Sequence, residues 1–328
     1  MKFFCLCMSP AIDATVTLPR APKGDGEIFK DVAEEENVGG KTVNVARWLA
    51  LRGADVACGG LLGEDNDRPF AKELAKYGIE DRFVRVAGAT RRNEMIVWPG
   101  GSMKLNRSAF PGLGSGTTGT TETAGTAGTD ETTEAHGAIE ALIENVLSRL
   151  SCSSQMSRGA GVAILSGSLP PAIPKDFYAR AIAAFKAQGW QTVLDASGEA
   201  MRLGLEAAPD LIKPNAEECE PLVGFVPKTP EEFARATAML REKAAHVVIS
   251  DGGAGAWFDG TFVPAPKVVV VDTTAAGDTL LAEFCWRFLA EGLPNAEAGR
   301  WAVAAGSAAC TMPGGAPPPL EVVAQLGK

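Results

Sequence analysis

The chain has 328 residues, of which 46% are hydrophobic and 22% are charged, and its formal net charge is −9. This length allows one large α/β domain or two smaller ones, and the apolar content is ample for a single core. The acidic balance argues against general binding to nucleic acid or to an anionic membrane, so an anionic substrate would need a local cluster of lysine and arginine.

The sequence predicts a cytoplasmic protein. Residues 1–8 are apolar but too short for a secretory signal, and Pro10 follows at once. No apolar run is long enough to span a bilayer. The seven cysteines are odd in number and lack metal-ligand spacing, which is typical of reduced thiols in a core.

The first elements along the chain are two predicted strands. Residues 3–8 are a candidate for a central strand, and residues 12–18 alternate apolar and polar as a half-exposed strand does. Asp13 lies on the polar side of this alternation, where a lone acid is usually solvated. The adjacent Arg91 and Arg92 lie between two further predicted strands, and such a pair is also most often solvated.

A glycine pair, Gly39 and Gly40, opens the first predicted helix. Glycine lets a ligand approach the backbone closely. Lys41 and Asn44 follow one helical turn apart, so both can face the same ligand. A Gly-Gly-Lys sequence is by itself a weak signal.

The middle of the chain predicts an insertion followed by a regular α/β pattern. Residues 112–137 are rich in Gly and Thr and are predicted to be disordered or loosely looped. An amphipathic helix is predicted for residues 139–150. From Gly161 onward strands alternate with helices, and polar or glycine-rich segments repeatedly follow the strands. These segments therefore lie at the C-terminal ends of the strands, and in an open parallel sheet ligands bind at the edge that those ends form.

The segment from Asp272 to Asp278 is a small-residue turn between a predicted buried strand, Val268–Val271, and an apolar helix pattern. Such a turn directs backbone N–H groups to one point at the positive end of a helix dipole, which suits a phosphate. Asp278 in the first helical turn can accept a proton from a hydroxyl group. From the turn alone, it can equally be an ordinary first-turn acid.

Together these motifs resemble the PfkB (ribokinase-like) carbohydrate kinases, and within them the 1-phosphofructokinase and tagatose-6-phosphate kinase branch. The resemblance covers nearly the whole chain apart from residues 112–137 and a short second insertion at 151–159. Six segments match in order: Ser9–Asp13, Gly39–Arg47, Thr90–Asn93, Ser166–Pro171, Lys213–Glu218 and Asp272–Asp278.

The resemblance implies an α/β fold with a ribokinase-like, Rossmann-type, mostly parallel sheet, flanking helices and a small β-sheet lid over the sugar. It implies a single kinase domain over residues 1–328, with lid segments at about 13–37 and 88–107 and the low-complexity insertion at 112–137. It also implies a homodimer formed through the lid strands.

The resemblance further implies a role for each matched residue. Asp278 is the implied general base, and the amides of Ala275, Ala276 and Gly277 form the implied anion hole. The residues implied to contact the sugar or its phosphate are Asp13, Gly39, Gly40, Lys41, Asn44, Arg91 and Ser168. Those implied to bind the nucleotide are Lys213, Asn215, Ser250, Gly252 and Gly255. Asn215 and Glu218 are implied to organise Mg²⁺, often through water.

The implied function is the phosphorylation of a ketohexose phosphate by ATP with Mg²⁺, first of all fructose 1-phosphate to fructose 1,6-bisphosphate. A monovalent cation such as K⁺ is compatible with it. Tagatose 6-phosphate and fructose 6-phosphate are close alternatives. An unphosphorylated sugar or nucleoside is a further one, and a catalytically dead sugar-phosphate-binding protein belongs to a different class.

Two residues depart from the family pattern, which has glycine at both positions. Thr42 follows Lys41 and is expected to tighten the sugar end of the pocket. Ala275 opens the anion hole, where we expect the family geometry with negative φ.

Overall fold

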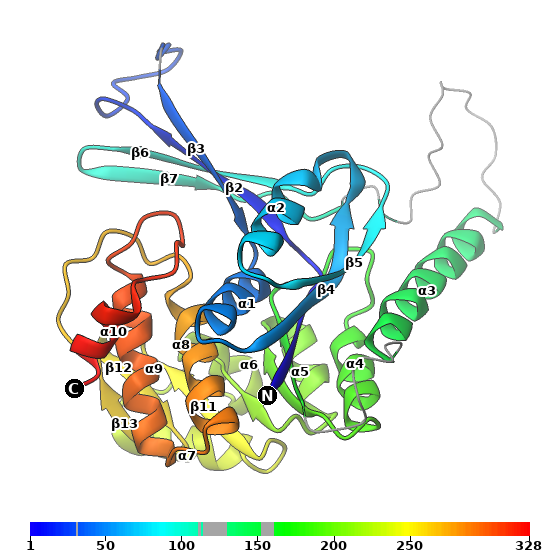
Figure 1. Ribbon diagram of the computed structural model, residues 1–328, viewed down its shortest axis with the longest axis vertical. Coiled ribbons are helices and arrows are strands. Elements are labelled where there is room, and N and C mark those ends of the chain that lie inside the picture. The colour runs from blue at the N-terminus through cyan, green and yellow to red at the C-terminus, as the bar shows by residue number, and fades with distance from the viewer. Residues whose placement is uncertain (31, 111–112, 114–129, 152–160) are drawn as a thin grey trace.

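The computed structural model describes residues 1–30, 32–110, 113, 130–151 and 161–328. Its body is a sheet of nine strands in the order β13-β12-β11-β10-β9-β8-β1-β4-β5 (Figure 1). The strands are β1 (Lys2–Cys7), β4 (Asp55–Gly63), β5 (Glu80–Val86), β8 (Gly161–Ser166), β9 (Gln191–Asp195), β10 (Leu211–Ile212), β11 (His246–Ser250), β12 (Gly255–Phe258) and β13 (Thr261–Pro264). Neighbours are parallel except in the edge hairpin of β12 and β13, which pairs antiparallel with β11. The predicted mostly parallel sheet is therefore confirmed.

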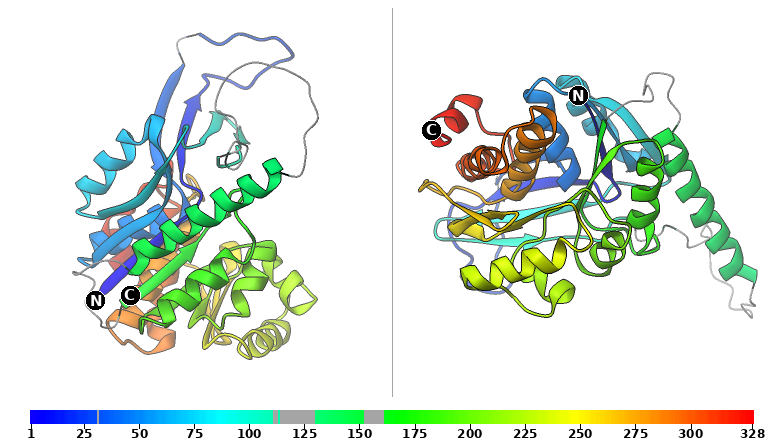
Figure 2. Two further views of the ribbon diagram at one scale, coloured as in Figure 1. Left: turned by 90° about the vertical axis from the view of Figure 1, so that its right-hand side faces the viewer. Right: turned by 90° about the horizontal axis from the view of Figure 1, so that it is seen from below.

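Helices cover both faces of this sheet (Figures 1 and 2). One face carries α1 (Lys41–Leu51), α2 (Arg68–Lys76), α8 (Ala276–Phe284), α9 (Asn295–Ala309) and α10 (Leu320–Leu326). The other carries α3 (Asp130–Ser151), α4 (Phe177–Lys186), α5 (Gly198–Leu205), α6 (Glu220–Val223) and α7 (Pro230–Leu240). After its first residue, Lys2, the central strand β1 is apolar because alternate residues enter different cores: Phe3 and Cys5 enter the first, Phe4 and Leu6 the second.

A second, smaller sheet projects from the body (Figure 1). Its four strands run in the order β3-β2-β6-β7 and are β2 (Ala11–Thr17), β3 (Ala33–Gly39), β6 (Arg92–Trp98) and β7 (Gly101–Leu105). The segments expected to form a lid, about 13–37 and 88–107, include β6 and β7 entirely, whereas β2 begins two residues before the first segment and β3 ends two residues after it. We refer to this sheet as the lid.

Two local predictions are wrong. Val268–Val271 forms no strand in the structure; Val269 is 83% exposed, and the sheet edge beside β11 is already occupied by the hairpin β12–β13. The segment 112–137 is not a loop throughout, because α3 begins at Asp130. Residues 111–112 and 114–129 lie outside the described residues. Within the described ranges, we find no helix with the length and apolar character needed to cross a bilayer.

Candidate functional site

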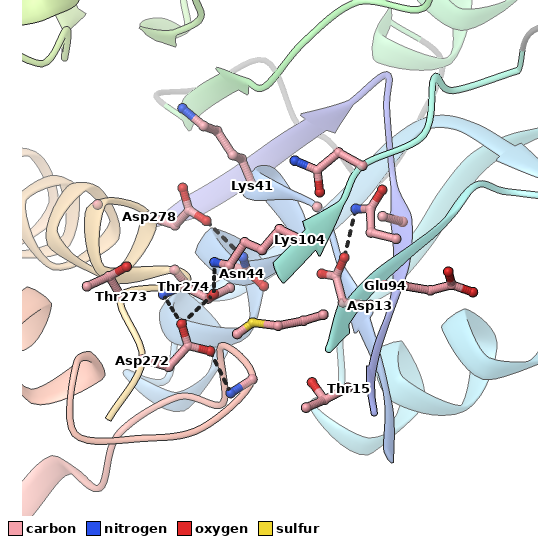
Figure 3. Close-up of a pocket in the computed structure, with 18 of the residues that line it drawn as sticks. Asp13, Thr15, Lys41, Asn44, Glu94, Lys104, Asp272, Thr273, Thr274 and Asp278 are labelled. Atoms are coloured by element: carbon pink, nitrogen blue, oxygen red, sulfur yellow. Dashed lines mark hydrogen bonds between the residues drawn. The ribbon is translucent and has the colours of Figure 1, made fainter. Parts of the chain in front are cut away.

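A cavity of about 450 Å³ lies between the lid and the body (Figure 3). The lid contributes strand residues such as Asp13 and Lys104, and the body contributes the start of α1, the segment after β10, the end of β11 and the turn before α8. The predicted site residues that line it are Asp13, Gly40, Lys41, Asn44, Arg91, Lys213, Asn215, Glu218, Ser250, Ala275, Gly277 and Asp278. Six separate sequence segments therefore meet in one cavity.

Asp278 is a nearly buried carboxylate, 7% exposed, in the first turn of α8. The side-chain NH₂ group of Asn44 donates a hydrogen bond of 2.8 Å to its Oδ2 (Figure 3). Burial raises the pKa of Asp278 to about 6; Lys41 lowers this pKa, and the neighbouring carboxylate of Asp195 raises it. A carboxyl group with this pKa is ionised at neutral pH and still basic enough to accept a proton.

The turn before α8 is held by the carboxylate of Asp272. Its Oδ1 accepts hydrogen bonds from the backbone N–H and the hydroxyl of Thr274, and its Oδ2 accepts one from the N–H of Gly314 (Figure 3). Ala275 caps the helix with φ of 62°, so the expected negative φ is wrong. A left-handed residue followed by a helix start forms a backbone concavity that binds anions. The N–H of Ala276 also lies 3.3 Å from the carbonyl of Thr273.

Two lysines converge on a buried acid that sequence reasoning missed. Asp195, at the end of β9, is 0% exposed, and its Oδ1 lies 3.2 Å from the Nζ of Lys213 and 3.5 Å from that of Lys41. The hydroxyl of Ser166 donates to its other oxygen at 2.9 Å. Burial by itself would raise the pKa of Asp195, but the two ammonium groups hold it below its usual value. The sequence signal that could have identified Asp195 as a site residue is its position at the C-terminal end of a predicted strand.

Asp13 lies against the glycine pair. A Cβ at Gly39 would come within 1.8 Å of its Oδ2, so only glycine leaves room for this carboxylate. Its Oδ1 accepts a hydrogen bond of 2.8 Å from the side chain of Asn93, on the neighbouring lid strand β6. Gly40 precedes α1 with φ of 113°, a conformation that favours glycine.

Three residues lie differently from expectation. The guanidinium of Arg91 lines the cavity but donates to the carbonyls of Ser9, Pro10 and Arg107 at 3.2, 3.3 and 2.9 Å. Ser168 is exposed, two residues beyond the end of β8, and lies outside the cavity. Thr42 is fully buried, and its hydroxyl lies 3.0 and 2.7 Å from the carbonyls of Leu6 and Ser166. It therefore joins the helix to the central strands, and the expectation that it narrows the pocket is wrong.

A third lysine, which is outside the predicted set, lines the cavity from the lid. Lys104 on β7 places its Nζ 3.4 Å from the hydroxyl of Thr274, so it reaches from the lid to the turn before α8 (Figure 3). Its sequence context is a plain alternating strand, which carries no signal of a site.

A larger cavity, of about 830 Å³, adjoins the first. Asn215, Ser250, Thr273 and Gly277 line both cavities, so the two meet at the turn before α8. Ala276, Gly252 and Gly255 belong to the second cavity alone. Its apolar wall consists of Ala265, Val268, Val270, Leu280 and Val303. The valine run mispredicted as a strand thus forms part of a cavity wall.

Asn215 and Glu218 hold one another in place. The backbone N–H of Glu218 donates to the Oδ1 of Asn215 at 2.8 Å, and the backbone N–H of Asn215 donates to the Oε2 of Glu218 at 2.9 Å. Both side chains line the first cavity. The other carboxylate oxygen of Glu218, Oε1, takes no part in these two hydrogen bonds.

Comparison with known proteins gives concordant results. The model of the pfkB family of carbohydrate kinases matches residues 8–98 and 153–322. A 1-phosphofructokinase of Vibrio cholerae is 32% identical over 291 residues, covering 87% of this chain and 82% of the relative. A 1-phosphofructokinase of Rhodobacter capsulatus is 30% identical over 333 residues, and the match covers 100% of this chain and 96% of the relative.

A similar fold is found in phosphofructokinase-2 of Escherichia coli, solved in complex with substrates and products. Its TM-score is 0.79 at 24% identity, with 100% of this chain and 98% of that chain covered. The same enzyme has been solved in complex with potassium and as a tetrameric inhibited form.

Proposed function

Because this chain belongs to the pfkB family of carbohydrate kinases, we propose that it transfers the γ-phosphoryl group of ATP to a hydroxyl group of a ketohexose phosphate. The observation that carries the proposal is the position of Asp278. This buried, hydrogen-bonded carboxylate stands beside a helix N-terminus where two cavities meet. We take residues 1–328 as a single kinase domain that includes the lid.

In this proposal Asp278 is the general base, and the acceptor hydroxyl lies in the first cavity. The backbone N–H groups of Ala275, Ala276 and Gly277 then face the phosphoryl group in transit, and that of Ala276 has to exchange its 3.3 Å hydrogen bond to the carbonyl of Thr273 for one to the phosphate. The first N–H groups of a helix lack partners within the helix, and the helix dipole adds positive potential there. Phosphoryl transfer depends mainly on such positioning and charge stabilisation.

The sugar is proposed to bind in the first cavity. Asp13, Gly40 and Asn44 contact its hydroxyl groups, and Gly39, which lines neither cavity, acts by leaving room for the carboxylate of Asp13. Lys41 lies at the same wall, and the carboxylates of Asp195 and Asp278 raise its pKa even though burial alone would lower it. It therefore stays charged at physiological pH and suits an anionic sugar.

The nucleotide is proposed to bind in the second cavity. Its apolar wall suits a purine base. Gly252, where an added Cβ would meet nothing within 4 Å, lets the ligand approach the backbone closely, and Ser250 and Gly255 are proposed to complete the nucleotide site. Lys213 and Asn215 face the phosphates. A methyl group at Gly277 would come within 3.6 Å of the Nζ of Lys213, so this ammonium group adjoins the anion hole.

Magnesium fits the donor set of Asn215 and Glu218, because both residues line the cavity and both side chains carry oxygen atoms. In the described ranges, no group of three or more acid, histidine or cysteine side chains is arranged to hold a metal. The ion would therefore depend on water and substrate phosphates as further ligands. When bound, it would neutralise charge on the nucleotide. A monovalent cation is a further candidate cofactor, on the ground that a structural relative was solved in complex with potassium.

The first substrate to consider is fructose 1-phosphate, because the two relatives described above are 1-phosphofructokinases. Fructose 6-phosphate and tagatose 6-phosphate are alternatives with the same charge. Arg91 and Ser168 are the residues proposed to hold the sugar phosphate.

One observation favours a second candidate, an unphosphorylated sugar or nucleoside. The guanidinium of Arg91 is engaged by three backbone carbonyls, and Ser168 lies outside the cavity. Both would have to move, or other groups would have to replace them, for a phosphate to be bound as expected.

The test is the release of ADP by the full chain with Mg-ATP and a panel of acceptors. The panel comprises fructose 1-phosphate, fructose 6-phosphate, tagatose 6-phosphate, free hexoses and nucleosides. Turnover with a ketohexose phosphate at least tenfold above that with any free sugar supports the proposal. Preference for a free sugar supports the second candidate, and no turnover with any acceptor leaves a binding protein.

We propose that two copies associate through the lid and that the protein works in the cytoplasm. The lid exposes Met103 and Leu105 on β7 by 45% and 42%, and the segment between β2 and β3 exposes Ile28 by 80%. Buried thiols such as Cys5, Cys7 and Cys58 suit a reducing compartment.

A further inference from the structure

A chain of hydrogen bonds runs from the interior of the body to the carboxylate of Asp278. Arg47, on α1, is 3% exposed. Its Nη2 donates to the Oδ1 of Asn44 at 2.5 Å, and the Nδ2 of Asn44 donates to the Oδ2 of Asp278 at 2.8 Å. Arg47 lies outside the cavity, so it touches neither the sugar nor the nucleotide in the arrangement proposed above.

The chemistry of arginine decides which way the Asn44 amide faces. A guanidinium group carries only donors, so the atom of Asn44 that faces it must be the oxygen. The NH₂ group then has to face Asp278. An N–H directed at this carboxylate stabilises its ionised form, whereas a carbonyl oxygen in that place would accept from its protonated form.

Other contacts hold Arg47 itself. Its Nη1 donates to the Oε1 of Glu73 on α2 at 3.0 Å, and its Nη2 also lies 3.4 Å from the carbonyl of Gly315. Gly315 packs against the turn before α8, since a Cβ there would lie 3.1 Å from Thr274. Arg47 thus joins α1, α2 and the loop beside the catalytic turn.

We propose that Arg47 is a positioning residue for phosphoryl transfer: it orients the amide of Asn44 so that its NH₂ group holds the carboxylate of Asp278 ready to accept a proton. The proposal rests on the function proposed above. It assigns no contact between Arg47 and either substrate.

The inference predicts a shift in titration. The groups that face Asp278 are Lys41 and Asn44 on α1, Asp195 at the end of β9 and Lys213 after β10, and replacing Arg47 leaves all four in place. Without Arg47 the Asn44 amide can turn and accept from protonated Asp278, and a positive charge is also lost. Both effects favour the protonated acid, so its pKa should rise by about half a unit to one unit.

The first readout needs no turnover. Asp278 is titrated by infrared spectroscopy in protein carrying isotope-labelled aspartate, and its signal is assigned by its loss in Asp278→Asn. In Arg47→Met the titration should move upward from about 6. The matched control is Arg52→Met, because Arg52 follows the same helix and pairs with the buried Glu283 at 3.2 Å without touching Asn44. This control should lose stability without moving the titration.

A double-variant cycle separates orientation from simple charge loss. In Asn44→Ala the amide is absent, so adding Arg47→Met should produce less than half of the shift seen in the wild-type background. An equal shift in both backgrounds, or no shift in Arg47→Met, overturns the proposal. If Arg47→Met does not fold, the same titration is measured in Arg47→Met/Glu73→Gln, which also removes the charge of Glu73 that loses its arginine partner.

The second readout is the acid limb of kcat against pH with the acceptor found active. This limb should move upward with the titration, while the KM for ATP stays within twofold. A wild-type protein without turnover refutes the proposed function, yet the infrared shift still decides the role of Arg47.

Discussion

At the scale of single residues, the site contains a buried carboxylate, Asp278, whose ionised form is made less stable by its burial. Asp278 is 7% exposed, and its pKa of about 6 lies above that of an aspartate in an unfolded chain, about 3.9. Between these two pH values the folded state binds more protons than the unfolded state. Stability therefore rises as pH falls through 6 toward 4, and the ionised group destabilises the fold above pH 6. Catalytic basicity and stability are thus opposed at this position.

Asp278→Asn should abolish turnover by several orders of magnitude and make the fold more stable. The amide has nearly the same shape but cannot act as a base, and it removes a buried charge. A two-unit pKa shift corresponds to about 2.7 kcal/mol, so we expect the free energy of unfolding at pH 7.5 to rise by about 1–3 kcal/mol. Urea unfolding and the ADP-release assay measure the two effects.

The matched control for this prediction is Asp272→Asn. Hydrogen bonds from Thr274 and Gly314 outweigh burial and lower the pKa of Asp272, so its ionised form is the stabilising one. This contribution is present above the unfolded pKa and is lost as pH falls. Asp272→Asn should therefore destabilise the fold. If Asp278→Asn retained a tenth of the activity, its assignment as the base would be wrong.

Ala275→Gly should stabilise the protein by about 0.5–1 kcal/mol. The residue has φ of 62°, where a Cβ costs roughly 1–2 kcal/mol, and part of the gain is lost to the greater freedom of glycine in the unfolded chain. Turnover should change by less than about tenfold, or 1.4 kcal/mol in the barrier, because the backbone N–H is unchanged. Denaturant midpoints and kcat are the measurements.

The control is Ala276→Gly, one residue into the helix, which should lose about 0.5–1 kcal/mol. A gain in turnover far above tenfold in Ala275→Gly would mean that the methyl group obstructs the phosphate. The chain would then be a degraded kinase.

At the scale of elements, the cavity is made where lid strands and body helices approach one another. β2 and β6 pair in parallel, which brings Asp13 opposite Asn93, and β7 carries Lys104 toward the turn before α8. Arg91 connects this lid to the body through the carbonyls of Ser9 and Pro10. A residue chosen from sequence as a phosphate ligand therefore also has a structural role.

Arg91→Ala should raise the KM for the sugar phosphate at least tenfold and leave that for ATP nearly unchanged. One charge-assisted hydrogen bond is worth about 1.5–3 kcal/mol. The variant should also lower the melting temperature, because three carbonyls lose a donor. The control is Arg107→Ala, which keeps the backbone carbonyl that Arg91 contacts and removes only an exposed contact to Glu94. Equal effects on both substrates would favour the unphosphorylated acceptor.

At the scale of the whole molecule, the lid has one face toward the cavity and open edges elsewhere. β3 and β7 are edge strands, and Met103 and Leu105 alternate with Lys104 along β7, so they point away from the cavity. Exposed apolar residues beside an unpaired strand edge favour association with another strand.

Met103→Asp/Leu105→Asp should convert a dimer into a monomer in sedimentation velocity at micromolar concentration. Burying two unpaired charges at the interface costs free energy, and the apolar contacts of Met103 and Leu105 are lost as well, so both effects favour the monomer. Met239→Asp is the control, because Met239 is 38% exposed on α7 of the body and should not affect assembly. A wild-type monomer, or a lid variant that remains dimeric, would contradict association through the lid.

Local pattern was sufficient for much of this protein. The alternation of strands and helices after Gly161, the glycine pair before α1 and the turn ending in Asp278 depend on neighbours in the chain, so they were predictable. The matched motifs then placed most residues of the cavity.

Long-range packing decided the rest. Asp195 became a site residue only when Lys41 and Lys213, far apart in sequence, were brought to the same carboxylate. Thr42 was turned toward the sheet by the register of α1 on β1 and β8. The run Val268–Val271 has the composition of a strand, but a strand needs a free edge to pair with, and the hairpin β12–β13 occupies the edge beside β11. Composition and periodicity report which face of an element is apolar, whereas partners across the sheet and across the cavity are known only once the chain has folded.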